Sequence, residues 1–333
     1  MDLDYSTRGQ CKITMFGYVD KILAAWKKVN QSPDGDGFKI VDSKRKTKSS
    51  AAPENILAVD EDCKKLDPVK AKAFHNIVAK ALYVMKRARP DISVAIAFLT
   101  TRVREPDQDD WDKLSHLMRY LHGTRELPLI LGADGTGIVK WFVDASFAVH
   151  PNMRSHSGGA ITLGRGCPYV TSTKQKLNTR SSTESELVGV DDLMPSILST
   201  RNFLKAQGYE VTENILYQDN KSSILLEKNG KASSSKRTRH IAIRYFFVTD
   251  RIAKGELTVE WCPTADMIAD FMTKPLQGVL FRKFRDIVMG IEVIKPGKDV
   301  SSKKSGDNVG KGKSKSVRAT KSRSIGTKSL ARY

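Results

Sequence analysis

The order of the predicted elements after residue 138 constrains the fold more than any other feature of this chain. Three short runs rich in β-branched and aromatic residues, joined by Gly-rich or polar turns, predict three successive strands. A helix over 181–208, a strand, two helices, a strand and a last helix over 265–273 follow, with a kink or a split expected at Pro195. This order predicts an α/β fold in which helices flank a mixed five-stranded sheet.

The residues before this unit are predicted to be mainly helical. Residues 1–35 begin with a strand-like run and continue with a helical pattern, whereas residues 33–65 lack periodicity and indicate a long loop. A stripe of apolar residues predicts a helix over 71–88, which Pro90 ends. We therefore expect the chain to divide into segments at 1–138, 139–278, 279–294 and 295–333.

The charge of the chain indicates what it binds. The formal net charge is +19, and residues 295–333 hold twelve Lys or Arg against two Asp, a net +10. The rest of the chain is therefore basic as well, and both parts favour a polyanionic partner such as nucleic acid. Because the last segment has few apolar residues, we expect a disordered basic tail that serves as a nucleic-acid arm or a nuclear-import signal.

Other features exclude several classes of protein. The four cysteines are scattered without a C-x-x-C pair, so neither a zinc site nor a disulfide framework is expected. No apolar run reaches the roughly 18 residues of a membrane span, and no signal peptide opens the chain. We expect an intracellular protein that has no membrane partner and no small-molecule cofactor.

Four carboxylates stand in positions that suit metal-assisted phosphodiester chemistry. Asp144 and Asp219 follow apolar runs that predict strands, and Glu186 and Asp270 lie near the starts of predicted helices. Acids at strand ends and helix starts can converge in space although they are far apart in sequence. Four such acids can hold two divalent cations about 3.5–4 Å apart, the geometry for in-line hydrolysis of a phosphodiester. Octahedral Mg²⁺ suits oxygen ligands, and Mn²⁺ can substitute for it.

Two of these positions have a competing acid nearby. Glu184 and Glu186 each complete a capping box, and residues two apart on a helix do not face the same way, so one of the two can enter the site. Asp266 and Asp270 lie four apart, on one face of the predicted last helix. The helix dipole alone explains an acid at position 266.

Several motifs of medium length occur in one order along the second half of the chain. They are VDASF, S-x-S-GG at 155–159, TKQK, SSTESEL, YQDN, KRTRHIAIRYFFV and A-D-x-x-TKPL. With these motifs, residues 139–278 resemble the ribonuclease H domain of copia-type LTR retrotransposon polyproteins. Residues 2–138 resemble the reverse transcriptase thumb and connection that precede this domain in the family. The resemblance implies hydrolysis of the RNA strand of RNA–DNA hybrids by two Mg²⁺ ions.

The resemblance also favours one acid in each competing pair. Glu186 directly precedes an aliphatic residue, as ribonucleases H generally have it, and Asp270 directly precedes the run Phe-Met-Thr-Lys-Pro of the family pattern. It implies that these two acids, together with Asp144 and Asp219, are catalytic and bind the metal ions. It further implies a location in a cytoplasmic virus-like particle or in the nucleus.

Basic residues around this unit are predicted to contact phosphates. The candidates lie in and after the basic loop and beside the third strand, at Lys236, Arg237, Arg239, Arg244, Lys174 and Lys176. His240 either aids product release or is a structural histidine. His150 and His156 have no ligand spacing with any cysteine, so we expect no metal role for them.

One departure from the family pattern bears on function. Family members carry a Y-x-D-D acid pair upstream, whereas Tyr18-Val19-Asp20-Lys21 is one acid short. We therefore expect a truncated or separated fragment without polymerase activity, whose partners are an RNA–DNA hybrid and the rest of a reverse transcriptase. The alternative is a folded but catalytically idle nucleic-acid-binding remnant. The number of acids and the A-D-x-x-TKPL ending disfavour an integrase or a resolvase.

Overall fold

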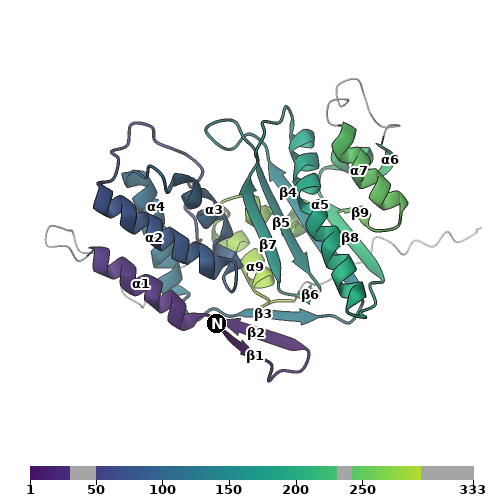
Figure 1. Cartoon of the computed structure of the whole chain (residues 1–333), viewed down its shortest axis with the longest axis horizontal. Coiled ribbons are helices and arrows are strands. Elements are labelled where there is room, and N and C mark those ends of the chain that lie inside the picture. Colours follow the sequence, from purple (N-terminus) through teal and green to yellow (C-terminus); the bar gives the residue numbers. More distant parts are fainter. Residues whose placement is uncertain (31–49, 231–241, 294–333) are drawn as a thin grey trace, which may run out of the picture. The chain divides into compact units, whose positions relative to one another are not determined.

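The second half of the chain builds the mixed five-stranded sheet that the sequence predicts. The computed structural model describes residues 1–30, 50–230 and 242–293. The strands of this sheet are β4 (Ile138–Ser146), β5 (His156–Thr162), β7 (Tyr169–Lys174), β8 (Glu213–Gln218) and β9 (Thr258–Trp261). Their order is β7-β5-β4-β8-β9, so β4 is central, antiparallel to β5 and parallel to β8 (Figure 1). The helices after β7 are α5 (Ser182–Ala206), α6 (Lys221–Asn229), α7 (Ala242–Ala253), α8 (Asp270–Thr273) and α9 (Gly278–Val288).

The side chains of β4 alternate between two cores, because successive residues of a strand point to opposite faces. Trp141 and Val143 belong to the core that α5 forms with the sheet. Phe142 belongs to the core on the other face, where α8 packs against β4 and β5. Asp144 shares this second face, since the hydroxyl of Thr273 on α8 donates to its carboxylate. A buried acid thus lies near the end of a strand whose neighbouring residues are also buried.

The two glycines of the S-x-S-GG run let helices approach β5 from both faces. A Cβ at Gly158 would lie 2.6 Å from Cγ2 of Thr273 and 2.7 Å from Cβ of Met272, both on α8. A Cβ at Gly159 would lie 2.9 Å from Cδ2 of Leu193 on α5. These distances are shorter than van der Waals contact, so a side chain at either position would push a helix away. Gly158 pairs with Asp144 across the sheet, which makes this contact the one that brings α8 to the acid.

The first half of the chain packs on the α8 face of the large sheet. A core that includes Trp26, Phe74 and Leu117 is continuous with Phe142 and Met272. A second, antiparallel sheet has the order β1-β2-β3-β6, so a strand from beyond residue 139 completes it. Packing contacts therefore cross the predicted boundary at 138/139, and this boundary stays a prediction. The elements are β1 (Asp2–Asp4), β2 (Gln10–Thr14), α1 (Phe16–Asn30), α2 (Pro68–Met85), η1 (Pro90–Ile92), α3 (Ser93–Arg102), α4 (Gln108–Gly123), β3 (Leu129–Ala133) and β6 (Gly164–Arg165).

Helix α2 begins three residues earlier than the apolar stripe predicts. Asp67 caps it by accepting hydrogen bonds from the backbone N–H groups of Val69 and Lys70, and Pro68 occupies the first turn, where no backbone donor is needed. In the segment after it, RARPDI, Arg89 forms a buried ion pair with Asp91. Among the described residues, no helix combines the length and the apolar character that crossing a membrane requires.

Of the kink or split expected at Pro195, the split does not occur and the kink stays a prediction, and the expectation of one continuous last helix was wrong. Helix α5 is not split at Pro195 but runs through it, because Leu193, Met194 and Ile197 around the proline are all buried in the core that α5 forms with the sheet. The predicted last helix over 265–273 is two separate elements, the single turn η4 (Thr264–Asp266) and α8. Met267 between them is extended, with φ −73° and ψ 94°, which ends the helical path.

Several predictions concern residues outside the described ranges. These are most of the expected loop at 33–65, the basic loop that contains Lys236, Arg237, Arg239 and His240, and the basic tail at 295–333. They stay predictions.

Candidate active site

Three of the four predicted acids meet at the carboxyl end of the central strands. Asp144 is near the end of β4, Glu186 is in the second turn of α5, and Asp219 directly follows β8. Each offers one carboxylate oxygen, and these three oxygens lie within 4.8 Å of one another. Parallel pairing of β4 with β8 explains part of this convergence, because parallel strands end at the same edge of the sheet. The group forms a compact, oxygen-only ligand set.

The geometry separates the two glutamates at the start of α5. Glu186 belongs to the acid group and is only 5% exposed, whereas Glu184 accepts a hydrogen bond from the backbone N–H of Arg180 at 2.7 Å. Ser181 accepts from the backbone N–H of Glu184 and caps the helix. Glu184 thus stabilises the start of the helix, and Glu186 is the acid that points to the others. Its catalytic role stays a prediction.

The two aspartates near the end of the unit are also separated, although not as the sequence suggested. Asp266 and Asp270 do not share a helix face, because they lie on η4 and α8. Asp266 is exposed and pairs with Lys283 of α9 at 3.1 Å. Asp270 is buried and pairs with Lys274, which also lies 3.7 Å from Asp144. Asp270 therefore adjoins the three clustered acids through a shared lysine.

Burial and repulsion between the acids raise the pKa of Glu186, Asp144 and Asp270. Burial, followed by the charges of Asp144 and Asp219, raises the pKa of Glu186 well above its usual value. Burial also raises the pKa of Asp144, against the opposing effects of Lys274 and Thr273. Burial and the charge of Asp144 raise the pKa of Asp270 to about 6. A divalent cation would offset both the burial of the negative charges and their repulsion, so the site is suited to bind one.

The acids fit a divalent metal on a second, independent ground. The Oε2 atom of Glu186 is buried and has no hydrogen-bond partner among the residues that the structure describes. An unpaired buried carboxylate oxygen is costly unless a cation or a proton satisfies it. Hard carboxylate oxygens without a thiolate or an imidazole among them suit Mg²⁺ or Mn²⁺ rather than zinc. The ligand set would therefore accept the metal that the sequence implied.

Sequence reasoning missed side chains that hold these acids in place. Gln175 of the TKQK motif donates from Nε2 to Ser157 Oγ at 2.8 Å and to the carbonyl oxygen of Ser185 at 2.9 Å. It thereby ties the residue before Glu186 to β5. The motifs carried a signal for Gln175, and also for Thr273 and Lys274 next to Asp270, since all three lie inside the runs quoted for the family resemblance.

The basic residues that the sequence predicts to contact phosphates lie in different environments. Arg244 on α7 is bound to Asp191 of α5 at 2.5 Å, so it ties two helices together. Lys176 is exposed beside β7. Burial and the nearby positive charges of Arg154 and Arg102 lower the pKa of Lys174. A concentration of positive charge therefore lies at the end of β7, and its contact with phosphates stays a prediction.

The two histidines of the turn between β4 and β5 bind each other. His150 Nε2 lies 3.0 Å from His156 Nδ1, and His156 Nε2 lies 2.8 Å from Ser172 Oγ. Burial lowers the pKa of His150 to about 4 and that of His156 to about 3, so both rings are neutral at physiological pH. The pair is a structural link between strands.

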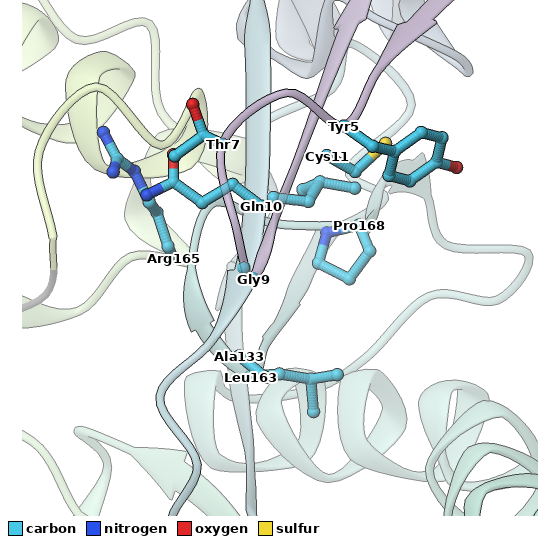
Figure 2. Close-up of a pocket in the computed structure, with 11 residues that line it drawn as sticks. Tyr5, Thr7, Gly9, Gln10, Cys11, Ala133, Leu163, Arg165 and Pro168 are labelled. Carbon is cyan, nitrogen blue, oxygen red and sulfur yellow. The ribbon is translucent and has the colours of Figure 1, made fainter.

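A well-formed cavity lies away from the acids. It is an open hollow of about 440 Å³ between the small sheet and the β5–β7 connection, and none of the four acids lines it. Figure 2 shows that Tyr5, Gln10, Pro168 and Arg165 surround it. Arg165 already donates from Nε to the carbonyl oxygen of Gly290 at 2.6 Å. The cavity has mainly apolar walls and adds no group to the chemistry of the acids.

Comparisons with known proteins agree with this architecture. The Pol polyprotein of transposon RE1 from Arabidopsis thaliana is 31% identical over 235 residues, which are 70% of this chain and 16% of the relative. The Pol polyprotein of transposon TNT 1-94 from Nicotiana tabacum is 28% identical over 216 residues, 65% of this chain and 16% of the relative. No protein-family model matches. The chain thus spans about one sixth of the length of these relatives.

One solved structure is similar in part. The N-terminal RNase H domain of rv2228c from Mycobacterium tuberculosis, solved as a fusion with maltose binding protein, covers 41% of this chain at 14% identity, with a TM-score of 0.28. That score is too low to support an inference.

The strand order around β4 and the acids at its carboxyl end define a ribonuclease H-like α/β domain. The extended similarity to RE1 and TNT 1-94 is more specific than the fold. The chain belongs to the copia-type retrotransposon Pol polyproteins.

Proposed function

We propose that this protein hydrolyses the RNA strand of RNA–DNA hybrids with two divalent cations, Mg²⁺ or Mn²⁺. The observation that carries the proposal is the convergence of oxygens from Asp144, Glu186 and Asp219 within 4.8 Å. The buried, unpartnered oxygen of Glu186 supports a cation among them, since the described residues offer it no other partner. Membership in the Pol family supports a nucleic-acid substrate.

Each acid has a distinct place in this proposal. Bound cations would activate the attacking water and neutralise charge at the attacked phosphodiester. Asp144, Glu186 and Asp219 would hold one cation, and Asp144 and Asp270, which share contact with Lys274, would hold the other. Burial and the charges of Asp144 and Asp219 raise the pKa of Glu186, and a bound cation would favour its ionised form.

Charge complementarity supports the nucleic-acid partner. The formal net charge of +19 favours binding to a polyanion, and Lys174 lies among further positive groups near the end of β7. Recognition of RNA over DNA would use its 2′-hydroxyl groups, which the shallow minor groove of a hybrid displays. Such hybrids arise where retrotransposon RNA is copied, so an intracellular location and a reverse transcriptase partner are part of the proposal.

The test is cleavage of a labelled RNA–DNA hybrid by the full chain. The full chain is needed because the core on the α8 face continues into the first half of the molecule. With Mg²⁺, we expect cleavage of the RNA strand and none of a DNA duplex. Asp144→Asn and Asp219→Asn should each reduce the rate by more than about 100-fold, since removing a direct ligand exceeds the 10–100-fold effect of outer-shell partners.

Asp266→Asn is the matched control, because this aspartate is exposed and pairs with Lys283 outside the acid group. It should cleave like the wild type. Equal cleavage by the wild type and by the Asp144 and Asp219 variants would indicate a contaminating nuclease and reject the assignment. Binding of the hybrid without any cleavage would leave a nucleic-acid-binding protein.

A further inference from the structure

Lys274, the lysine of the TKPL run, brings its ammonium group against two of the four acids. Its Nζ lies 2.7 Å from Oδ1 of Asp270 and 3.7 Å from Oδ2 of Asp144. The two acid side chains are 7% and 5% exposed, whereas the lysine side chain is 39% exposed. The charged end of a partly exposed chain thus reaches a buried pair of carboxylates.

The backbone conformation at the end of α8 places Lys274 next to the acids. Lys274 ends α8, and its N–H donates to the carbonyl oxygen of Asp270 at 3.0 Å. Helix α8 itself is held against β5 by the close contact with Gly158. Thr273, the preceding residue, donates its hydroxyl to Asp144. The packing of α8 therefore fixes the backbone position from which the ammonium group reaches both acids.

The other half of the acid group has no such internal cation. Asp219 accepts from the hydroxyl of Thr264 at 3.0 Å, and Glu186 Oε2 has no partner among the described residues. No lysine or arginine of the described part of the chain forms an ion pair with Glu186 or Asp219. The site thus consists of a half that lacks a positive charge and a half that already contains one.

We propose that Lys274 is the built-in cation of the Asp144–Asp270 half, and that a divalent ion enters this half only by displacing its ammonium group. The inference deepens the proposed function and rests on it. The first ion binds the half that contains Glu186 and Asp219, where no positive side chain competes. The second ion meets a positive charge at the place it must occupy, so it binds more weakly. The lysine also keeps Asp144 and Asp270 together when the second ion is absent.

The test is the binding of Mn²⁺ to the full chain at pH 7, measured by titration calorimetry without nucleic acid. The wild type should show one tighter and one weaker site. Lys274→Met should tighten the weaker site by at least about tenfold, because it removes a like charge within a few ångströms of the ion. Lys274→Arg keeps the charge and should retain the wild-type isotherm. If Lys274→Met does not fold, Lys274→Gln carries the same test.

Lys283→Met is the matched control. It removes the same charge from another Lys–Asp pair, where Nζ lies 3.1 Å from exposed Asp266, and should leave both Mn²⁺ sites unchanged. A folded Lys274→Met protein that binds the second ion no more tightly than the wild type overturns the inference, and so does tightening by Lys274→Arg. The proposed function fails separately, if Asp219→Asn leaves the tighter site intact.

Discussion

Glu227 is a fully buried carboxyl group next to β8, the strand that Asp219 directly follows. It lies on α6, where Ser223 Oγ donates to its Oε1 at 3.0 Å, and the amide group of Gln218 lies 3.1 and 3.2 Å from its two oxygens. Burial raises the pKa of Glu227 from 4.5 to about 8. The folded protein therefore holds this group protonated at neutral pH.

The raised pKa makes stability depend on pH in a defined direction. Between pH 4.5 and about 8 the folded state keeps a proton that the unfolded chain releases, so this contribution to stability is complete below pH 4.5 and is lost as the pH rises through about 8. At about 1.4 kcal/mol for each pH unit, the loss is about 3 kcal/mol at pH 7 and about 5 kcal/mol above pH 8.

Glu227→Gln removes the titration and keeps the size and hydrogen bonding of the side chain. We expect the variant to match the wild type at pH 5 and to exceed its free energy of unfolding by about 3 kcal/mol at pH 7. Urea unfolding at pH 5, 7 and 9, followed by tryptophan fluorescence, measures the difference. Glu213→Gln, an exposed glutamate at the start of β8, is the control. A difference between Glu227→Gln and the wild type that stays constant from pH 5 to pH 9 would refute the reasoning.

Two further predictions concern packing and acid stability. Gly158→Ala places a Cβ 2.6 Å from Thr273 and should cost about 1–3 kcal/mol of stability and weaken Mn²⁺ binding, whereas Gly17→Ala, which meets nothing within 4 Å, should cost none. Urea unfolding and calorimetry measure both effects. His156, whose pKa is lowered to about 3, contributes stability above pH 6.5 that is lost as the pH falls toward 3. His156→Gln should therefore show a smaller decrease in unfolding free energy than the wild type between pH 7 and pH 5, by about 2 kcal/mol, and an equal decrease would contradict the prediction.

The sequence predicts the large sheet well because each of its strands has a recognisable local sequence pattern. The run around Asp144 is β-branched and aromatic, and it is bounded by turn residues, so its type does not depend on distant contacts. The helix errors have the opposite cause. The burial of Leu193 and Ile197 stabilises α5 on both sides of Pro195, so the helix continues through it. At Met267 the backbone is extended and ends the helical turn, although periodicity alone predicts one helix from there into α8. In both places tertiary packing overrides local preference.

For the acids, the sequence indicates which residues are present and the structure indicates how far apart they lie. The spacing of Asp266 and Asp270 suggested one helix face, and the chain instead turns between them, leaving one acid on the surface and one beside Asp144. The contact of Gly158 with α8 brings Asp270 to the three acids that already meet at the ends of β4 and β8 and at the start of α5, and the sequence alone does not show this contact.

This contact also explains why one short motif carries so much of the site. Because Gly158 leaves room for α8, the short run from Asp270 to Lys274 places three groups at the site. Asp270 is an acid, the hydroxyl of Thr273 donates to Asp144, and the ammonium group of Lys274 lies near both acids. Buried carboxylates at this distance repel one another, so a helix bringing an acid alone would be opposed by the charge already present. By bringing Lys274 with Asp270, the helix places a positive charge between two of the acids and offsets their repulsion.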